Sequence, residues 1–68
     1  MQAVKLNDGS YPDLVNGKIY NVSKVTSTHI ILQGSNRHYC PSSFIILLNN
    51  TPIPFKQAYA ISKLRGNT

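Results

Sequence analysis

The stretch Arg37-His38-Tyr39-Cys40-Pro41-Ser42-Ser43-Phe44-Ile45-Ile46-Leu47 carries the strongest indication of a fold. A strand-like segment runs into Pro41 and leaves the Pro-Ser-Ser turn as an apolar strand. Pro41 lacks an N–H and has a fixed φ, so it cannot continue a paired strand. Ser42 and Ser43 can hydrogen-bond the local backbone and close a tight turn. The pattern predicts a sharp break between two short strands, as occurs where a small barrel changes sheets.

Turn-forming residues divide the rest of the first 48 residues into further short strands. Residues 7–13 are dense in Asn, Asp, Gly, Ser and Pro and predict a loop, and Asn16-Gly17 predicts a turn before a strand. In the first strand Val4 and Leu6 are the alternating apolar positions, which predicts that they face the core. The five predicted strands are residues 2–6, 18–25, 29–33, 37–40 and 44–47.

The character of the chain changes after the fifth strand. Residues 49–54 contain two prolines and predict a linker that cannot extend a central strand. Residues 55–65 have the apolar spacing of a helix, and residues 66–68 form a tail whose Gly66 suits a helix C-cap. We therefore predict an all-β fold: a small five-stranded barrel over residues 1–48, with a C-terminal α-helix packed on it.

Two stretches resemble the Src-homology-three-like barrel family. Asp13-Leu14, followed by Gly17-Lys18-Ile19-Tyr20-Asn21-Val22, is similar to the family's acidic residue and Leu before a Gly and an alternating strand. Cys40-Pro41-Ser42-Ser43-Phe44-Ile45 is similar to its ending of an apolar residue, Pro-Ser, a small residue, an aromatic and a β-branched residue. The resemblance covers roughly residues 2–48 and implies the barrel fold rather than an activity.

The chain departs from the peptide-binding members of that family. Those members resemble one another in an Ala-Leu-Tyr-Asp-Tyr start and in a Trp that lines a groove for proline-rich ligands. Here the corresponding start is Ala3-Val4-Lys5-Leu6-Asn7, and the chain has no Trp. The chain is also similar to short bacterial and phage open reading frames with a Gly-Lys-x-Tyr-x-Val strand, most of which have no assigned activity.

The charge of the chain is one-sided. Seven Lys and Arg residues against two Asp residues and no Glu give a net charge of +5. Both acids, Asp8 and Asp13, fall in the loop of residues 7–13, so the rest of the chain is purely basic. This balance favours acidic partners such as nucleic acid or an anionic protein surface. It is also ordinary for a small soluble domain, where it serves solubility.

The titratable residues do not form an enzymatic pattern. Asp8 and Asp13 have no third acid, and Asp8 suits closure of a turn. His29 and His38 fall on neighbouring predicted strands without an acid, which favours surface histidines over a metal pair. Cys40, the only cysteine, is predicted to be a buried and inert thiol. We expect no catalytic residue, no metal site and no cofactor.

The sequence also limits the compartment. A lone cysteine excludes an internal disulfide, and a small domain without disulfides fits a reducing cytoplasm. Residues 1–5 lack the apolar run of a secretion signal, and the longest apolar block is too short for a membrane-spanning helix. We expect a cytoplasmic protein, located in the host cytoplasm if it is phage-encoded.

The sequence thus predicts a non-enzymatic protein-interaction module that docks a basic, aromatic-containing face onto a host or other partner protein. Aromatic and Arg side chains dominate interface energies, which selects the groove residues. The predicted partner-binding residues are Tyr11, Arg37, Tyr39 and Phe44, with Lys56 and Lys63 as electrostatic support.

Two alternatives stay open. Tyr20, Tyr39 and Tyr59 together with basic residues such as Lys18 and Lys24 would suit a small nucleic-acid-binding barrel, although core packing explains most of these tyrosines. A homo-oligomer, in which an edge strand or the helix completes a neighbour's core, is consistent with so small a domain.

Overall fold

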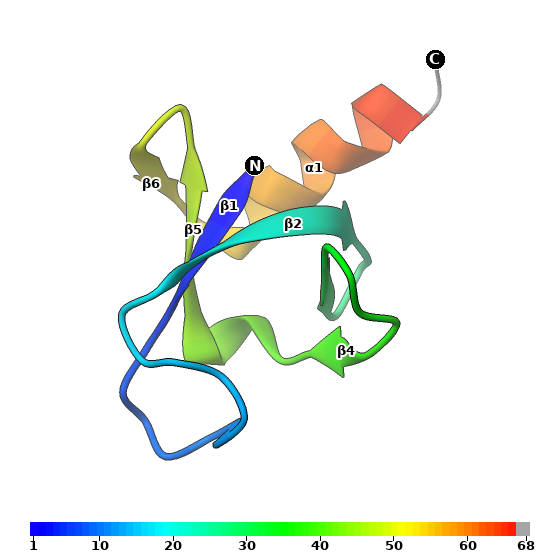
Figure 1. Cartoon of the computed structure of the whole chain (residues 1–68). Helices are drawn as coiled ribbons and strands as arrows, with labels where there is room; N and C mark the ends of the chain where they lie inside the picture. The colour runs from blue at the N-terminus through cyan, green and yellow to red at the C-terminus, as the bar shows by residue number, and fades with distance from the viewer. Residues whose placement is uncertain (67–68) are drawn as a thin grey trace.

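The structure is a computed structural model that describes residues 1–66, so the last two residues of the predicted tail lie outside the described residues. Four strands, a 3₁₀ turn, two further strands and one helix follow one another along the chain (Figure 1). The elements are β1 (Gln2–Lys5), β2 (Ile19–Val25), β3 (Ile30–Leu32), β4 (His38–Tyr39), the 3₁₀ turn η1 (Pro41–Ser43), β5 (Phe44–Leu48), β6 (Thr51–Ile53) and α1 (Phe55–Gly66).

All six strands belong to one antiparallel sheet with the order β4-β3-β2-β1-β5-β6. Within the described residues the terminal strands β4 and β6 do not pair with each other, so the sheet is open. The sheet is therefore not a closed barrel, and it has six strands where the sequence predicted five. Closure requires the end strands to pair, but β4 has only two residues and β6 carries a proline. The prediction of a mainly β fold with a C-terminal helix is confirmed.

The sixth strand lies inside the predicted linker of residues 49–54. Asn49 and Asn50 both adopt positive φ, 51° and 65°, which is the backbone of a two-residue hairpin turn. The chain then returns along β5, with Ile53 opposite Ile46. Pro52 is tolerated because β6 is an edge strand, where a missing N–H leaves no sheet hydrogen bond unmade.

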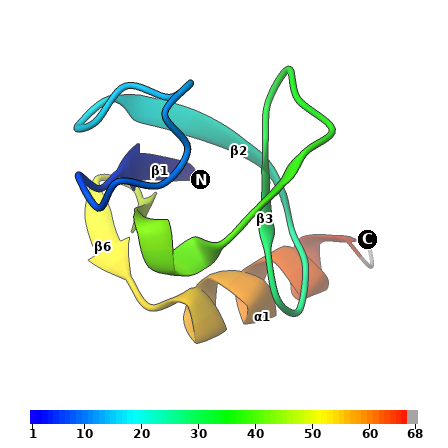
Figure 2. The same ribbon diagram turned by 90° about the horizontal axis from the view of Figure 1, so that it is seen from below.

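The core lies between the sheet and α1, which packs on β2 and β5 (Figure 2). Ala58, near the start of α1, is fully buried, and Tyr20, Val22 and Tyr59 are partly buried against the core, as their spacing predicted. The buried apolar residues are Ala3, Val25, Ile30, Leu32, Tyr39, Phe44, Ile46 and Ala58.

The inward face of β1 is not the predicted one. Ala3 and Lys5 are buried, whereas Val4 and Leu6 are only half-buried. Ala3 lies opposite Tyr20 on β2 and Ile46 on β5, two residues of the core side. A strand that alternates small, apolar, charged and apolar residues has two nearly equivalent faces, so tertiary packing decides between them.

No helix in residues 1–66 is long and apolar enough to cross a membrane.

Candidate functional site

Four of the predicted partner-binding residues gather in one cluster. The ring of Tyr11 stands edge-on to Tyr39, with 4.9 Å between centroids, and Phe44 lies 5.9 Å from Tyr39. The Arg37 guanidinium lies 4.8 Å from the centroid of Tyr11 and 5.4 Å from that of Tyr39. Edge-to-face rings and a cation over ring faces are both favourable arrangements. We call Tyr11, Arg37, Tyr39 and Phe44 the aromatic cluster.

The aromatic cluster belongs largely to the core. Tyr39 is 4% exposed and Phe44 is 6% exposed, which leaves little of either ring for a partner. The Tyr11 hydroxyl accepts a hydrogen bond of 2.7 Å from the N–H of Cys40, and Arg37 forms an exposed ion pair of 3.4 Å with Asp13. The cluster therefore fastens the loop of residues 7–13 to the end of β4.

Cys40 is exposed, which corrects the prediction of a buried thiol. It lies between β4 and η1, in extended backbone immediately before Pro41, where the chain leaves the sheet. The Ser42 hydroxyl lies 3.0 Å from Sγ, and hydrogen bonds from Ser42 lower the pKa of the Cys40 thiol below its ordinary value. The turn that begins at Pro41 thus turns the cysteine side chain outward.

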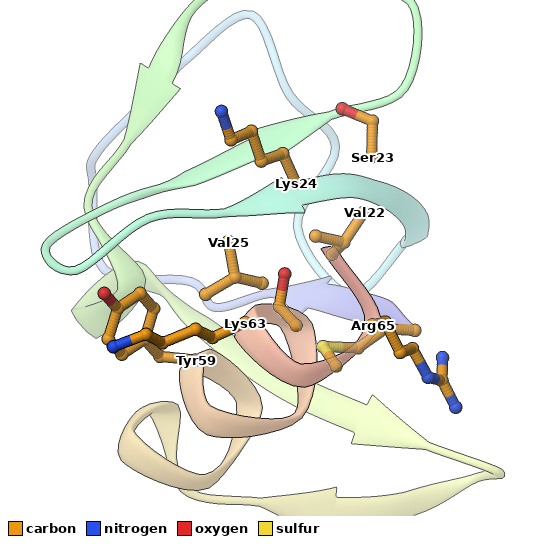
Figure 3. A pocket seen from close by; sticks show the side chains of 9 residues that line it. Val22, Ser23, Lys24, Val25, Tyr59, Lys63 and Arg65 are labelled. Atoms are coloured by element: carbon orange, nitrogen blue, oxygen red, sulfur yellow. The ribbon is translucent and has the colours of Figure 1, made fainter. Parts of the chain in front are cut away.

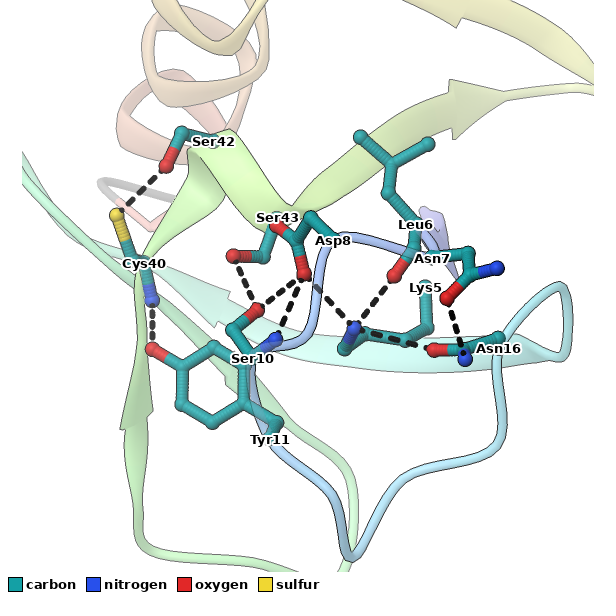
Figure 4. A network of polar contacts seen from close by, with 10 residues as sticks. All are labelled: Lys5, Leu6, Asn7, Asp8, Ser10, Tyr11, Asn16, Cys40, Ser42 and Ser43. Carbon is teal, nitrogen blue, oxygen red and sulfur yellow. Dashed lines mark hydrogen bonds and ion pairs between the residues drawn. The ribbon is translucent and has the colours of Figure 1, made fainter.

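A polar network holds the loop of residues 7–13 against the end of β1 (Figure 4). The buried amino group of Lys5 donates to the carbonyl of Leu6, to Asp8 Oδ1 at 3.2 Å and to Asn16 Oδ1 at 3.3 Å. An ammonium group has three N–H donors, so these three acceptors satisfy it. Lys5 therefore ties this loop to β1, and its amino group has no N–H left to bind a partner.

Asp8 accepts hydrogen bonds from the hydroxyl and the N–H of Ser10. These bonds, with a smaller contribution from Ser43 and then Lys5, hold the pKa of the Asp8 carboxyl well below its usual 3.8. Asp8 closes the turn, as predicted.

Because the pKa of Asp8 is lowered in the folded chain, the free energy of unfolding depends on pH in the acidic range. A carboxyl whose pKa is depressed on folding contributes stability above its ordinary pKa, and this contribution is lost as the pH falls toward the folded-state value. We expect the denaturation midpoint to fall as the pH drops below about 4, and to fall less in Asp8→Asn. Guanidinium denaturation at several acidic pH values measures the midpoint of the wild type and of Asp8→Asn. Asp13→Asn, which leaves Asp8 intact, should keep the steep dependence; an equal flattening in both variants would contradict the assignment.

An open groove runs between β2 and the second half of α1 (Figure 3), with a volume of about 550 Å³. Val22 and Val25 point from β2 toward the helix, and Tyr59 and Lys63 approach from α1. Ser23 and Lys24 extend from β2 on the side away from the helix. The lining residues are Met1, Val22, Ser23, Lys24, Val25, Tyr59, Ser62, Lys63 and Arg65. We call this the β2–α1 groove.

The β2–α1 groove is basic. Lys24, Lys63 and Arg65 line it, and no acidic residue is among its described lining residues. The two acids of the chain, Asp8 and Asp13, lie in the loop that Lys5 and Arg37 hold. A groove with apolar walls and charges of one sign concentrates ligands of the opposite charge.

The groove contains one of the two predicted helix lysines. Lys63 lines the groove, and none of the four cluster residues does so. Lys56 is exposed seven residues earlier on α1, two helical turns away on the same side. Sequence reasoning missed the groove because strand β2 and helix α1 are far apart in the chain. The sequence held one signal of a surface there: Lys56, Tyr59 and Lys63 have the spacing of residues on one side of a helix.

The two histidines do face each other, with ring centroids 6.0 Å apart. Within residues 1–66 no group of three or more His, Cys, Asp or Glu side chains could hold a metal ion.

Comparison of the chain with protein-family models, with curated proteins and with solved structures gave no match in any of the three.

Proposed function

We propose that the chain is a non-enzymatic protein-interaction module, and that it binds an acidic segment of a partner protein in the β2–α1 groove. The observation that carries this proposal is the pairing of apolar side chains with a lining in which every described charged residue is positive. An aliphatic or aromatic side chain of the partner would lie against Met1 and Val22, which line the groove and are only partly buried. Its acidic neighbours would meet Lys63.

A protein partner suits this groove better than a nucleic acid does. Binding of single strands rests on exposed aromatic rings on which bases stack. Tyr59 is the aromatic residue among the described lining residues, and it is half-buried against the core. Aliphatic walls instead fit an amphipathic peptide, whose apolar side chains fill the groove and whose charges remain at the rim.

Three further parts of the proposal concern fold family, origin and location. The Pro-Ser-Ser segment that carries the resemblance to the Src-homology-three-like barrel forms the 3₁₀ turn before β5, which supports that family. A source among small bacterial or phage proteins rests on the sequence similarity alone. The lone cysteine supports a cytoplasmic location.

The proposal is tested with a labelled peptide of alternating Glu pairs and single Leu residues, measured by fluorescence anisotropy. We expect saturable binding that weakens from about 0.05 M to about 0.15 M salt. Lys63→Glu should weaken binding by about tenfold, because it replaces an attraction at the rim with a repulsion. Lys56→Glu is the matched control: it makes the same charge change on the same helix, outside the groove, and should have a much smaller effect.

Two further probes separate the alternatives. A peptide of equal charge with Ser in place of Leu should bind more weakly, because it cannot fill the apolar part of the groove. Oligothymidylate should bind more weakly than the Leu peptide at the higher salt. Equal losses in Lys63→Glu and Lys56→Glu would indicate a general effect of net charge, and tighter binding of the oligonucleotide would favour the nucleic-acid-binding alternative.

A further inference from the structure

The two histidines of the chain lie on one side of the β3–β4 pair of strands. Ile31 on β3 lies opposite His38 on β4, and His29 precedes Ile31 by two residues. These three side chains therefore share the side that alternates with the buried Ile30 and Tyr39. Side chains at such diagonal positions of two antiparallel strands are within reach of each other. The register thus brings together the two imidazole groups that the chain has.

The two rings have the separation that a shared metal ion requires. Their centroids are 6.0 Å apart, and their planes are inclined at 61°. Metal–nitrogen bonds of about 2 Å put the centroids of two coordinated imidazole rings about 5–6 Å apart. His38 is exposed and His29 is half-buried, so an ion from solvent can reach both rings.

Thr28 orients the ring of His29. Its Oγ1 lies 2.8 Å from His29 Nδ1, and the N–H groups of Thr28 and His29 both donate to Thr26 Oγ1 in the same turn. When an ion takes the lone pair of Nε2, Nδ1 keeps its hydrogen and donates it to Thr28. The sequence disfavoured a metal pair because no acid accompanies the histidines. In the structure a hydroxyl takes the orienting role that a carboxylate often has.

The basic residues nearest the pair leave room for a cation. Arg37, next to His38 in the chain, turns its guanidinium to two rings of the aromatic cluster and to Asp13. On β2, Lys24 lies opposite Ile31, which separates it from His38. Two strand spacings amount to about 10 Å. This is about one Debye length at physiological salt, so the repulsion from Lys24 is largely screened.

The donor set selects the class of ion. Two imidazole nitrogens suit divalent transition metals such as Zn²⁺, Ni²⁺ and Cu²⁺, whereas Mg²⁺ and Ca²⁺ require oxygen ligands. In the described part of the chain no third His, Cys, Asp or Glu completes a metal-binding group, and Cys40 Sγ contacts the Ser42 hydroxyl. Water or a ligand from outside the chain therefore fills the remaining coordination positions.

We infer that His29 and His38 form a binding site for a divalent transition-metal ion, which joins the start of β3 to β4 through one nitrogen of each imidazole. Strand β4 has only two residues and is an edge of the sheet, so the ion adds a further connection there. An ion that binds the folded chain preferentially also raises the unfolding midpoint. The site shares no residue with the β2–α1 groove.

Isothermal titration calorimetry with ZnCl₂ tests this inference on the untagged chain in a Cys40→Ser background, which removes the thiol as a competing ligand. We expect one Zn²⁺ per chain, a higher unfolding midpoint in Zn²⁺ and no binding of Mg²⁺. His29→Gln and His38→Gln should each weaken binding by about 100-fold, because chelation by two groups is lost. Thr28→Val should weaken it by about tenfold. Ser27→Ala is the matched control: it removes the neighbouring exposed hydroxyl, leaves Thr28 intact and should bind as the background chain does.

Circular dichroism establishes that each variant is folded, and because two variants probe the pair, loss of folding in one does not remove the test. Absence of Zn²⁺ binding between about 1 μM and about 1 mM overturns the inference. Unchanged affinity in both histidine variants also overturns it, since the ion would then lie elsewhere. Binding of two ions with equal affinity, one of which is lost in each variant, would show two independent surface histidines and overturn it as well.

Discussion

Tyr39→Ala is expected to destabilise the folded chain by about 3–5 kcal/mol, the usual cost of removing a large buried aromatic side chain. The Tyr39 ring is 4% exposed and packs between Tyr11 and Phe44, with the Arg37 guanidinium over it. Small domains have total stabilities near the low end of about 5–15 kcal/mol. This variant should therefore be largely unfolded near its physiological temperature, which thermal and guanidinium denaturation measure.

Tyr39→Phe is the control for this prediction. It keeps the ring and removes the hydroxyl, whose contact with the Ser35 hydroxyl is long, at 3.4 Å. We expect a loss of no more than about 1 kcal/mol. The pair of variants separates two roles for a residue that the sequence assigned to partner binding. If Tyr39→Ala cost under about 1 kcal/mol, the ring would be a surface contact rather than part of the core.

Lys5→Ala is expected to cost about 2–5 kcal/mol, the range for truncation of a long buried side chain. The side chain of Lys5 is 0% exposed, so its methylene groups are packed as those of a methionine would be. Its amino group joins β1 to Asp8 and Asn16 in the following loop. Removal of the side chain leaves both a cavity and a loosened loop, and the change appears as a lower denaturation midpoint.

Lys5→Met separates packing from charge. Methionine keeps the length of the side chain, and the released Asp8 and Asn16 are exposed and can be hydrated. Replacement of a buried ion pair by an apolar side chain of similar volume is often nearly neutral. We expect a loss within about 1.5 kcal/mol. An equal loss in Lys5→Met and Lys5→Ala would show that the hydrogen-bonded charge, rather than the methylene groups, stabilises this strand.

The local elements were predictable from the sequence because each has its own chemistry. The Pro41-Ser42-Ser43 break is the 3₁₀ turn η1, and Gly17 adopts φ of 79° in the turn before β2. The helix begins at the predicted Phe55 and extends one residue beyond the predicted end, to Gly66. Proline geometry, positive φ and helical spacing act within a few residues.

The errors concern features that depend on distant partners. Strand β6 was missed because Pro52 excludes a central strand but not an edge strand, and position within a sheet is a tertiary property. The burial of Lys5 depends on hydrogen-bond acceptors in the loop that follows β1, and one of them, Asn16, is eleven residues away in the sequence. Four of the predicted site residues lie together in the aromatic cluster, but the rings of Tyr39 and Phe44 are buried. The groove beside Lys63 arises only when α1 packs on β2.

The central place of β1 has a consequence for the order of synthesis. β1 is made before β2 and well before its second pairing partner β5, in which Leu47 lies opposite Gln2. At about 5–20 residues per second, the ribosome needs seconds to supply that partner. Throughout this time one edge of β1 has no native neighbour, so the sheet is completed only after β5 and β6 have been made.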